Sequence, residues 1–123
     1  LPSDVILPRV ALVVCHGGQM LVFESLRRRL PIMVLPTQPE QAQNGRCLER
    51  LGCGQRLFRG VVFDGASDSV MRALAHRSNQ DLAEATTALL SRPGLHDALR
   101  DFASDLGRYD GAVRMAETLE AAA

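Results

Sequence analysis

The chain has 123 residues, apolar residues make up 46% of it, and its formal net charge is zero. A chain of this length suits one globular domain that buries roughly two thirds of its unfolded surface. A membrane span of roughly twenty apolar residues, a secretory leader and a nucleic-acid-binding surface are not predicted, because no long apolar run, basic leader or net positive charge with stacking aromatics occurs.

The first half of the chain predicts a β-α-β-α-β order. Residues 10–15 (VALVVC) form a continuous apolar run that is typical of a parallel strand covered on both faces. Gly17 and Gly18 allow a tight turn, and apolar residues at helical spacing follow from Gln19 to about Arg29. Pro31 ends that helix, and residues 32–35 predict a second strand.

The third strand and the helices around it follow from the same kind of pattern. Pro39 is well placed to begin a helix that ends at Gly52, with Cys47, Leu48 and Leu51 on its inward face. Residues 55–58 predict a short third strand. Right-handed crossovers over such short links make all three strands parallel.

The rest of the chain predicts helices. Residues 59–68 are expected to be a loop with a short extended piece. Four helices are then expected, and their apolar residues are Val70, Met71 and Leu74; Leu82, Ala85, Leu89 and Leu90; Leu95, Ala98, Leu99, Phe102 and Leu106; and Tyr109, Ala112, Val113, Ala116 and Leu119. Ser67 or Ser69 is expected to cap the first of these helices. Pro93 and Gly94 are expected to end the second.

Charge and cysteine content narrow the interpretation further. Residues 1–62 carry a net charge of +4 and residues 63–123 one of −4. A basic half suits an anionic ligand, although solvated helix faces explain it equally well. Cys15, Cys47 and Cys53 form neither a CxxC pair nor a Cys/His ligand spacing, so we expect reduced, mostly buried thiols in a cytoplasmic protein and no metal site.

A candidate ligand site lies where the first two strands end. His16-Gly17-Gly18 follows the first strand, and the loop of residues 36–44 (PTQPEQAQN) follows the second. Two parallel strands that each end in a polar loop place both loops on the same edge of the sheet, where α/β proteins bind ligands. Glycines let a ligand approach the backbone, and the helix that follows offers free amide groups to a phosphate.

The order of these residues resembles the donor-binding domain of the nucleotide-sugar glycosyltransferases with the two-domain GT-B fold, the UDP-glycosyltransferase superfamily. The signature of that family looks like His-Gly-Gly-x-Gly-Thr/Ser-x-x-Glu-Ala-Leu, a Pro-ended strand, Asp/Glu-Gln-x-x-Asn and Gly-x-Gly. The matches run from about Leu7 to the C-terminal helices, and they are His16-Gly17-Gly18, Glu24-Ser25-Leu26, Pro31, Pro36, Glu40-Gln41, Asn44-Gly45 and Gly52-Cys53-Gly54.

The resemblance implies an α/β, Rossmann-like parallel sheet followed by C-terminal helices, as part of a GT-B donor-binding domain. It also implies roles for single residues. His16 contacts the donor diphosphate, and Glu24 accepts hydrogen bonds from both ribose hydroxyls. Glu40 and Gln41 recognise the hydroxyls of the sugar. The full set of expected donor-binding residues is His16, Gly17, Gly18, Gln19, Glu24, Glu40, Gln41 and Asn44. A solvated helix carboxylate, helix-start chemistry and a surface amide remain the alternatives for Glu24, for Glu40 with Gln41, and for Asn44.

The implied function is transfer of a hexosyl group from a nucleotide-diphosphate sugar to an acceptor hydroxyl, inverting, with no metal and no cofactor. Residues 1–123 are expected to be a single, incomplete C-terminal nucleotide-sugar-binding domain without catalytic residues. The resemblance implies that the acceptor domain, its base and earlier strands of the sheet lie outside these residues. An exposed sheet edge is therefore expected, where the chain packs against missing sequence or another copy of itself.

Two departures from the family pattern leave a second function open. Met20 and Leu21 stand where the family has Gly-Thr/Ser, and arginines fill the bend where the family has Gly. A non-catalytic glycosyltransferase-like partner or scaffold with a degenerate donor site is the alternative. A hydrolase that uses Ser25 and His16 is poorly supported, because no strand-turn-helix elbow surrounds Ser25.

Overall fold

The computed structural model describes residues 2–58, 68–109 and 111–122. Its elements, in chain order, are α1 (Ser3–Ile6), the 3-10 helix η1 (Leu7–Arg9), β1 (Val13–Cys15), α2 (Gln19–Arg27), β2 (Ile32–Val34), α3 (Pro39–Leu51), β3 (Gly54–Arg56), α4 (Asp68–Ala75), α5 (Asn79–Leu90), α6 (Leu95–Gly107) and α7 (Gly111–Ala122). The predicted loop at residues 59–68 falls almost wholly outside the described residues, as does Ser67.

The described strands form one parallel sheet in the order β1-β2-β3. Val13 pairs with Ile32, and Ile32 pairs with Gly54, so β2 is the central strand. The predicted α/β class, the β-α-β-α-β order and the parallel pairing are confirmed. The central strand is buried throughout, as expected for an apolar strand with neighbours on both edges.

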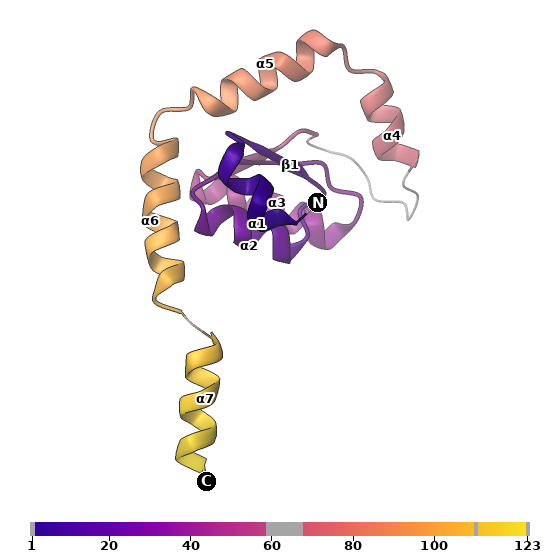
Figure 1. The fold of residues 1–123 in the computed structure, drawn as a ribbon. Coiled ribbons are helices and arrows are strands. Elements are labelled where there is room, and N and C mark those ends of the chain that lie inside the picture. The colour runs from indigo at the N-terminus through magenta and orange to yellow at the C-terminus, as the bar shows by residue number, and fades with distance from the viewer. Residues whose placement is uncertain (1, 59–67, 110, 123) are drawn as a thin grey trace.

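The hydrophobic core joins the sheet to the two helices between its strands and to two helices that follow the sheet in the sequence. Leu26 from α2, Leu48 from α3, Leu89 from α5 and Leu95 and Leu99 from α6 are all at most 2% exposed and belong to the same cluster as β2. Figure 1 shows α5 and α6 bent around the sheet, whereas α7 projects away beyond the end of α6. The helices α5 and α6 are therefore part of the α/β core, whereas none of the described side chains of α7 belongs to it.

A cluster of polar contacts fixes β3 from both sides. The Arg92 guanidinium donates to Gly54 O (3.1 Å) and to Gln55 Oε1 (2.6 Å), and Gln55 Nε2 donates to Ala85 O (3.2 Å). On the other side, Arg56 forms a half-buried ion pair with Glu49 of α3, 3.0 Å between Nη2 and Oε2. These contacts hold α5 and α3 against the outer strand.

Several details of the sequence prediction are wrong. The chain begins with α1 and η1, and the first strand covers Val13–Cys15 rather than residues 10–15. Cys47 and Leu51 are exposed, since α3 turns that side toward a cleft and buries Ala42, Gly45 and Leu48 instead. Ser69 lies inside α4 and does not cap it, and the last helix begins at Gly111, after Tyr109.

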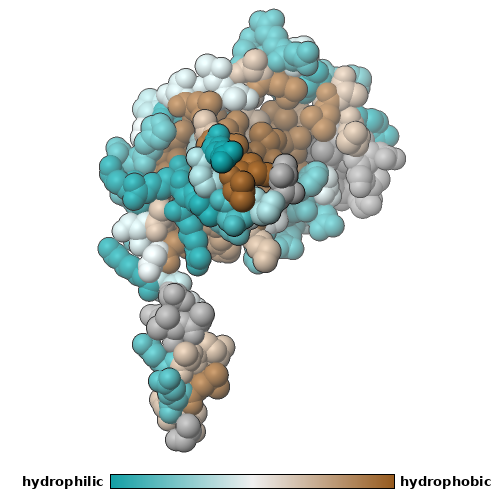
Figure 2. All heavy atoms as spheres, viewed as in Figure 1, coloured by the Kyte–Doolittle hydropathy of each residue, from teal (hydrophilic) through white to brown (hydrophobic). Residues whose placement is uncertain are grey.

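The first strand is open on one face. Val14 is 57% exposed, against the expectation of a strand covered on both faces, and among the described strands β1 pairs with β2 alone. Figure 2 shows apolar atoms gathered on the side of the molecule where β1 and α1 lie. An apolar hollow of about 410 Å³ lies there, lined by residues from α1 to the first turns of α2 (Ser3, Ile6, Leu7, Val10, Leu12, Val13 and Leu21). Among the described strands, β1 thus has one edge without a paired strand, and whether another chain packs there stays a prediction.

None of the helices in the described ranges combines the length and the apolar character that a membrane crossing requires.

Candidate donor-binding site

The His16-Gly17-Gly18 turn lies between the end of β1 and the start of α2. Gly17 has φ +92°, a conformation that favours glycine. A Cβ added there would lie 2.8 Å from Val34 Cγ1 and 3.1 Å from Gln41 O, so the first glycine is also required by packing. A Cβ added to Gly18 would meet nothing within 4 Å. The turn therefore packs tightly at Gly17 and is open at Gly18.

Two long-range hydrogen bonds attach this turn to the neighbouring loop and helix. His16 Nδ1 donates to the Leu35 carbonyl at 2.9 Å, and Asn44 Nδ2 of α3 donates to the Gly17 carbonyl at 2.8 Å. Leu35 N also donates to Cys15 O at 2.8 Å, which continues the pairing of β1 and β2 beyond the strands. The two polar loops thus lie side by side at the carboxyl edge of the sheet.

The bond to Leu35 fixes the position of a proton on His16. A carbonyl oxygen only accepts, so Nδ1 must carry the hydrogen. Nε2 is then an acceptor in the neutral ring and a donor in the imidazolium. His16 is exposed, so an anion that reaches Nε2 is bound best by the protonated ring.

The second loop is organised by Gln41. Its Oε1 accepts from Thr37 N at 2.8 Å and from Thr37 Oγ1 at 2.9 Å, which leaves the Nε2 amide hydrogens for other contacts. Thr37 was not among the predicted site residues, although a hydroxyl a few residues before Glu/Gln at a helix start is a capping signal. Glu40 beside it is exposed, and no described residue pairs with its carboxylate.

Glu24 and Gln19 lie on α2 apart from this network. Glu24 is half-buried in the middle of the helix, and its carboxylate has no hydrogen bond or ion pair with a described residue. Gln19 is exposed in the first turn. The structure therefore bonds His16 to Leu35, Gly17 to Asn44 and Gln41 to Thr37. It does not bring Glu24, Glu40 or Gln19 into these hydrogen bonds.

Two hollows flank the start of α2. The strand-end hollow, of about 540 Å³, is lined by Val14, Cys15, His16, Gly18, Leu21 and Leu35. The helix cleft, of about 220 Å³, lies between α2, α3 and α6 and includes Gln19, Asn44, Cys47 and Phe102 in its lining. Met20 is 82% exposed and lines neither hollow, whereas Leu21 lines the strand-end hollow. Of Met20 and Leu21, Leu21 therefore shares the lining of this hollow with His16, and Met20 does not.

Ser25 has no nucleophilic geometry. Its side chain is fully buried, and Oγ donates to the Leu21 carbonyl of the preceding turn at 2.6 Å. Neither hollow includes it in its lining. A hydrolase that uses Ser25 with His16 is therefore contradicted.

The cysteines are free thiols. Burial raises the pKa of Cys15, partly offset by a hydrogen bond from the Gly17 backbone, and burial also raises the pKa of Cys53. Both are therefore thiols rather than thiolates at neutral pH. Within the described ranges, no group of three or more His, Cys, Asp or Glu side chains is arranged to hold a metal ion.

Comparison with known proteins finds sequence similarity to named glycosyltransferases and a shared fold with one solved structure. No model of a known protein family matches the chain. Over 120 residues it is 26% identical to the NDP-glycosyltransferase YjiC of Bacillus licheniformis, and over 61 residues it is 34% identical to the demethyllactenocin mycarosyltransferase of Streptomyces fradiae; these matches cover 98% and 50% of this chain. The solved structure of the glycotransferase of kitacinnamycin superposes with a TM-score of 0.77 over 98% of this chain, at 23% identity.

These similarities confirm the resemblance predicted from the motifs. The sequence is similar to named glycosyltransferases, and the fold is that of part of a GT-B glycosyltransferase. The chain spans 26% and 13% of the lengths of the two curated relatives and 27% of the solved chain. It is therefore similar to about a quarter, or less, of each complete protein.

Proposed function

We propose that this chain is the donor-binding part of a glycosyltransferase and holds a nucleotide-diphosphate sugar while a hexosyl group passes to an acceptor hydroxyl. The observation that carries the proposal is the junction of His16 with Leu35 O and of Asn44 with Gly17 O, which unites the two strand-end loops. The carboxyl edge of a parallel sheet is where α/β folds bind nucleotides. The names of the relatives, which include an NDP-glycosyltransferase, support the same donor class.

The diphosphate is proposed to bind between His16 and the start of α2. The first amides of α2 have no partner within the helix, and Gly18, its N-cap residue, makes no side-chain cap. Such a helix end carries a partial positive charge that stabilises phosphate. His16 adds a charged donor when its ring is protonated.

The remaining residues are proposed to recognise the ribose and the sugar. Glu24 has two carboxylate oxygens free of described partners, which suits acceptance of hydrogen bonds from the two ribose hydroxyls. Glu40 accepts from sugar hydroxyls in the same way. Gln41 offers its Nε2 hydrogens, since Oε1 is occupied by Thr37.

The proposed reaction is a single inverting displacement at the anomeric carbon. A base on a separate acceptor domain takes the proton of the attacking hydroxyl while the bond to the diphosphate breaks. His16 and the amide end of α2 stabilise the negative charge that develops on the departing diphosphate. We propose that these groups perform this task without a metal ion. The three free cysteines support a cytoplasmic location.

The alternative is a non-catalytic partner with a degenerate donor site, and Leu21 is the feature that favours it. Its apolar side chain lines the strand-end hollow where the family places a hydroxyl. Calorimetry with UDP separates the two functions. Heat of binding supports the donor site, whereas no detectable heat at millimolar UDP supports the scaffold.

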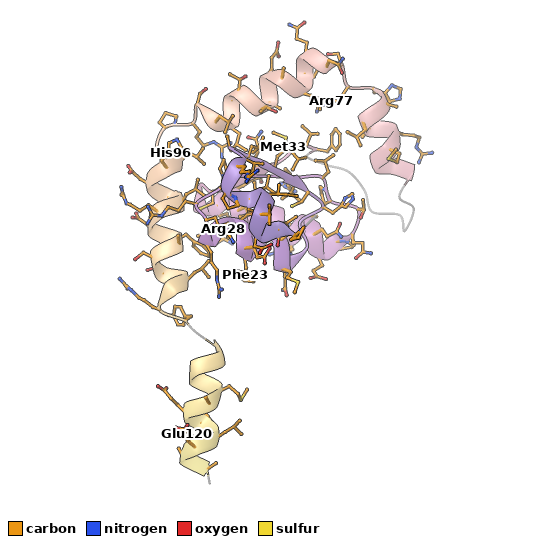
Figure 3. The ribbon with its side chains drawn as sticks, viewed as in Figure 1. Phe23, Arg28, Met33, Arg77, His96 and Glu120 are labelled. Atoms are coloured by element: carbon orange, nitrogen blue, oxygen red, sulfur yellow. The ribbon has the colours of Figure 1, made fainter. Side chains whose placement is uncertain are left out.

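Glu24→Ala gives a sharper test of ribose recognition. We expect UDP binding to weaken by about 1–3 kcal/mol, as for lost hydrogen bonds to a charged group. Glu120→Ala is the matched control, because Glu120 lies on α7, which extends away from the sheet (Figure 3). Unchanged UDP affinity in a folded Glu24→Ala protein would remove ribose recognition from the role of Glu24.

A further inference from the structure

We propose that Asn44 is a positioning residue. It orients the Gly17–Gly18 peptide so that the Gly18 N–H faces the strand-end hollow and can donate a hydrogen bond to an anion there. The inference rests on the proposed function, because the anion is the diphosphate of the donor. It assigns Asn44 an indirect role, through the backbone, rather than the direct ligand role that the family motif suggests.

The geometry of one peptide unit carries the argument. Asn44 Nδ2 donates to the Gly17 carbonyl at 2.8 Å, across 27 residues of sequence. The described peptide bonds are trans, and in a trans peptide the C=O and the following N–H point in opposite directions. Because Asn44 holds the carbonyl on its own side, the Gly18 N–H points to the other side.

The two hollows show what lies on each side of this peptide. Asn44 lines the helix cleft, whereas Gly18 lines the strand-end hollow with His16. The Gly18 N–H donates to no other described residue, and the space around its Cα is open. An unpaired amide beside an exposed His16 is suited to an anionic oxygen.

The turn depends on this bond because its backbone has an alternative. Gly17 at φ +92° has the wide conformational freedom of glycine, and rotation of the Gly17–Gly18 peptide would turn the N–H away from the hollow. The packing of Gly17 against Val34 and Gln41 fixes the Cα position. Asn44 is the side chain that also fixes the direction of the peptide.

The test combines two Asn44 variants with a backbone probe. Asn44→Ala removes the donor, and Asn44→Asp places an oxygen against the Gly17 carbonyl. Gln43→Glu is the matched control for charge, because it adds the same negative charge at an exposed neighbouring position of α3. UDP affinity is measured by calorimetry, and the Gly18 amide resonance is followed by 15N NMR while inorganic pyrophosphate is added.

We expect the Gly18 amide of the unaltered protein to shift with pyrophosphate. In both Asn44 variants that shift should be lost and the Kd for UDP should rise about tenfold, the effect of one misplaced hydrogen bond to a charged group. Gln43→Glu should change the Kd less than about twofold. A merely structural Asn44 would lower the melting temperature but leave the Gly18 response intact.

Three results would overturn the inference. The first is a Gly18 amide that ignores pyrophosphate in the unaltered protein while His16 responds, which decides the matter even if the variants fail to fold. The second is an unchanged Kd or an unchanged Gly18 response in folded Asn44→Ala. The third is no response to UDP or pyrophosphate anywhere, and this result alone removes the proposed function as well.

Discussion

The α/β half of the chain (residues 2–58) and the helical half (the described residues from 68 to 122) differ in what they contribute. Every candidate donor-binding residue lies in the α/β half. The helical half divides in two: Leu89, Leu95 and Leu99 of α5 and α6 are buried in the core of the sheet, whereas Met115 and Leu119 of α7 are exposed. Sequence pattern alone does not separate these helices, because all of them carry apolar residues at helical spacing.

The difference shows how the site is supported from a distance. Helix α6 packs against α2, the helix whose first turn borders His16, and Phe102 of α6 lines the helix cleft beside Asn44. Arg92, between α5 and α6, holds β3 through Gly54 and Gln55. We therefore infer that α5 and α6 stabilise the geometry of the site without contributing ligands to it.

The largest expected effect comes from a direct comparison of a buried leucine of α6 with an exposed leucine of α7. Leu99→Ala removes a fully buried side chain of α6 and should lower the free energy of unfolding by about 2–5 kcal/mol. Leu119→Ala makes the same substitution on α7, where Leu119 is 64% exposed. It should alter the free energy of unfolding by less than about 0.5 kcal/mol. Urea unfolding followed by circular dichroism measures both. Equal effects would show that α7 packs as closely as α6.

The sequence predicts the α/β half well because its signals are local. Apolar runs mark β1 and β2, Pro39 begins α3, and Gly52 with φ +72° ends it. The shared edge of the two loops follows from parallel pairing. The capping box of Ser78 and Asp81 at α5 is equally local, although the pattern of apolar residues does not reveal it.

The missing parts of the prediction depend on distant partners. The contact of Asn44 with Gly17 and that of His16 with Leu35 join residues 27 and 19 positions apart. The outward side of α3 at Cys47 and Leu51 depends on where α6 packs, and helical periodicity does not specify that. The use of Gln41 Oε1 by Thr37 likewise requires the actual path of the loop.

A smaller effect sharpens the comparison at the bend after α2. Arg29 has φ +58°, a left-handed conformation that costs an arginine about 1–2 kcal/mol, at the bend where the related family has glycine. Arg29→Gly relieves this strain but gains entropy in the unfolded chain. We therefore expect a net stabilisation of about 0.5–1 kcal/mol, seen as a higher melting temperature.

Arg28→Gly is the matched control for that substitution. Arg28 is also exposed and has φ −93°, which any residue adopts without strain. Glycine there brings only the entropic cost, so its melting temperature should fall slightly. A fall in both variants would mean that Arg29 is not strained in solution.

The smallest effect concerns the acid stability of α5, at the surface of the helical half. The Ser78 backbone N–H donates to Asp81 Oδ2 at 2.9 Å; this bond, the contact with the Ser78 side chain and the charge of Arg77 lower the pKa of Asp81. Because the carboxylate is favoured in the folded state, its stabilisation is complete above the ordinary aspartate pKa of about 3.9 and is lost as the pH falls through the lower folded value. The melting temperatures of the unaltered protein and of Asp81→Ala should therefore differ above about pH 4 and converge below it.

A difference that persists unchanged in stronger acid would show that Asp81 acts through packing rather than through its charge. The helix α5 contacts β3 through Ala85, so loss of this cap should disturb the α/β half only weakly. The chemical shift of the Gly18 amide, which lies beside β1 at the opposite edge of the sheet, should not change.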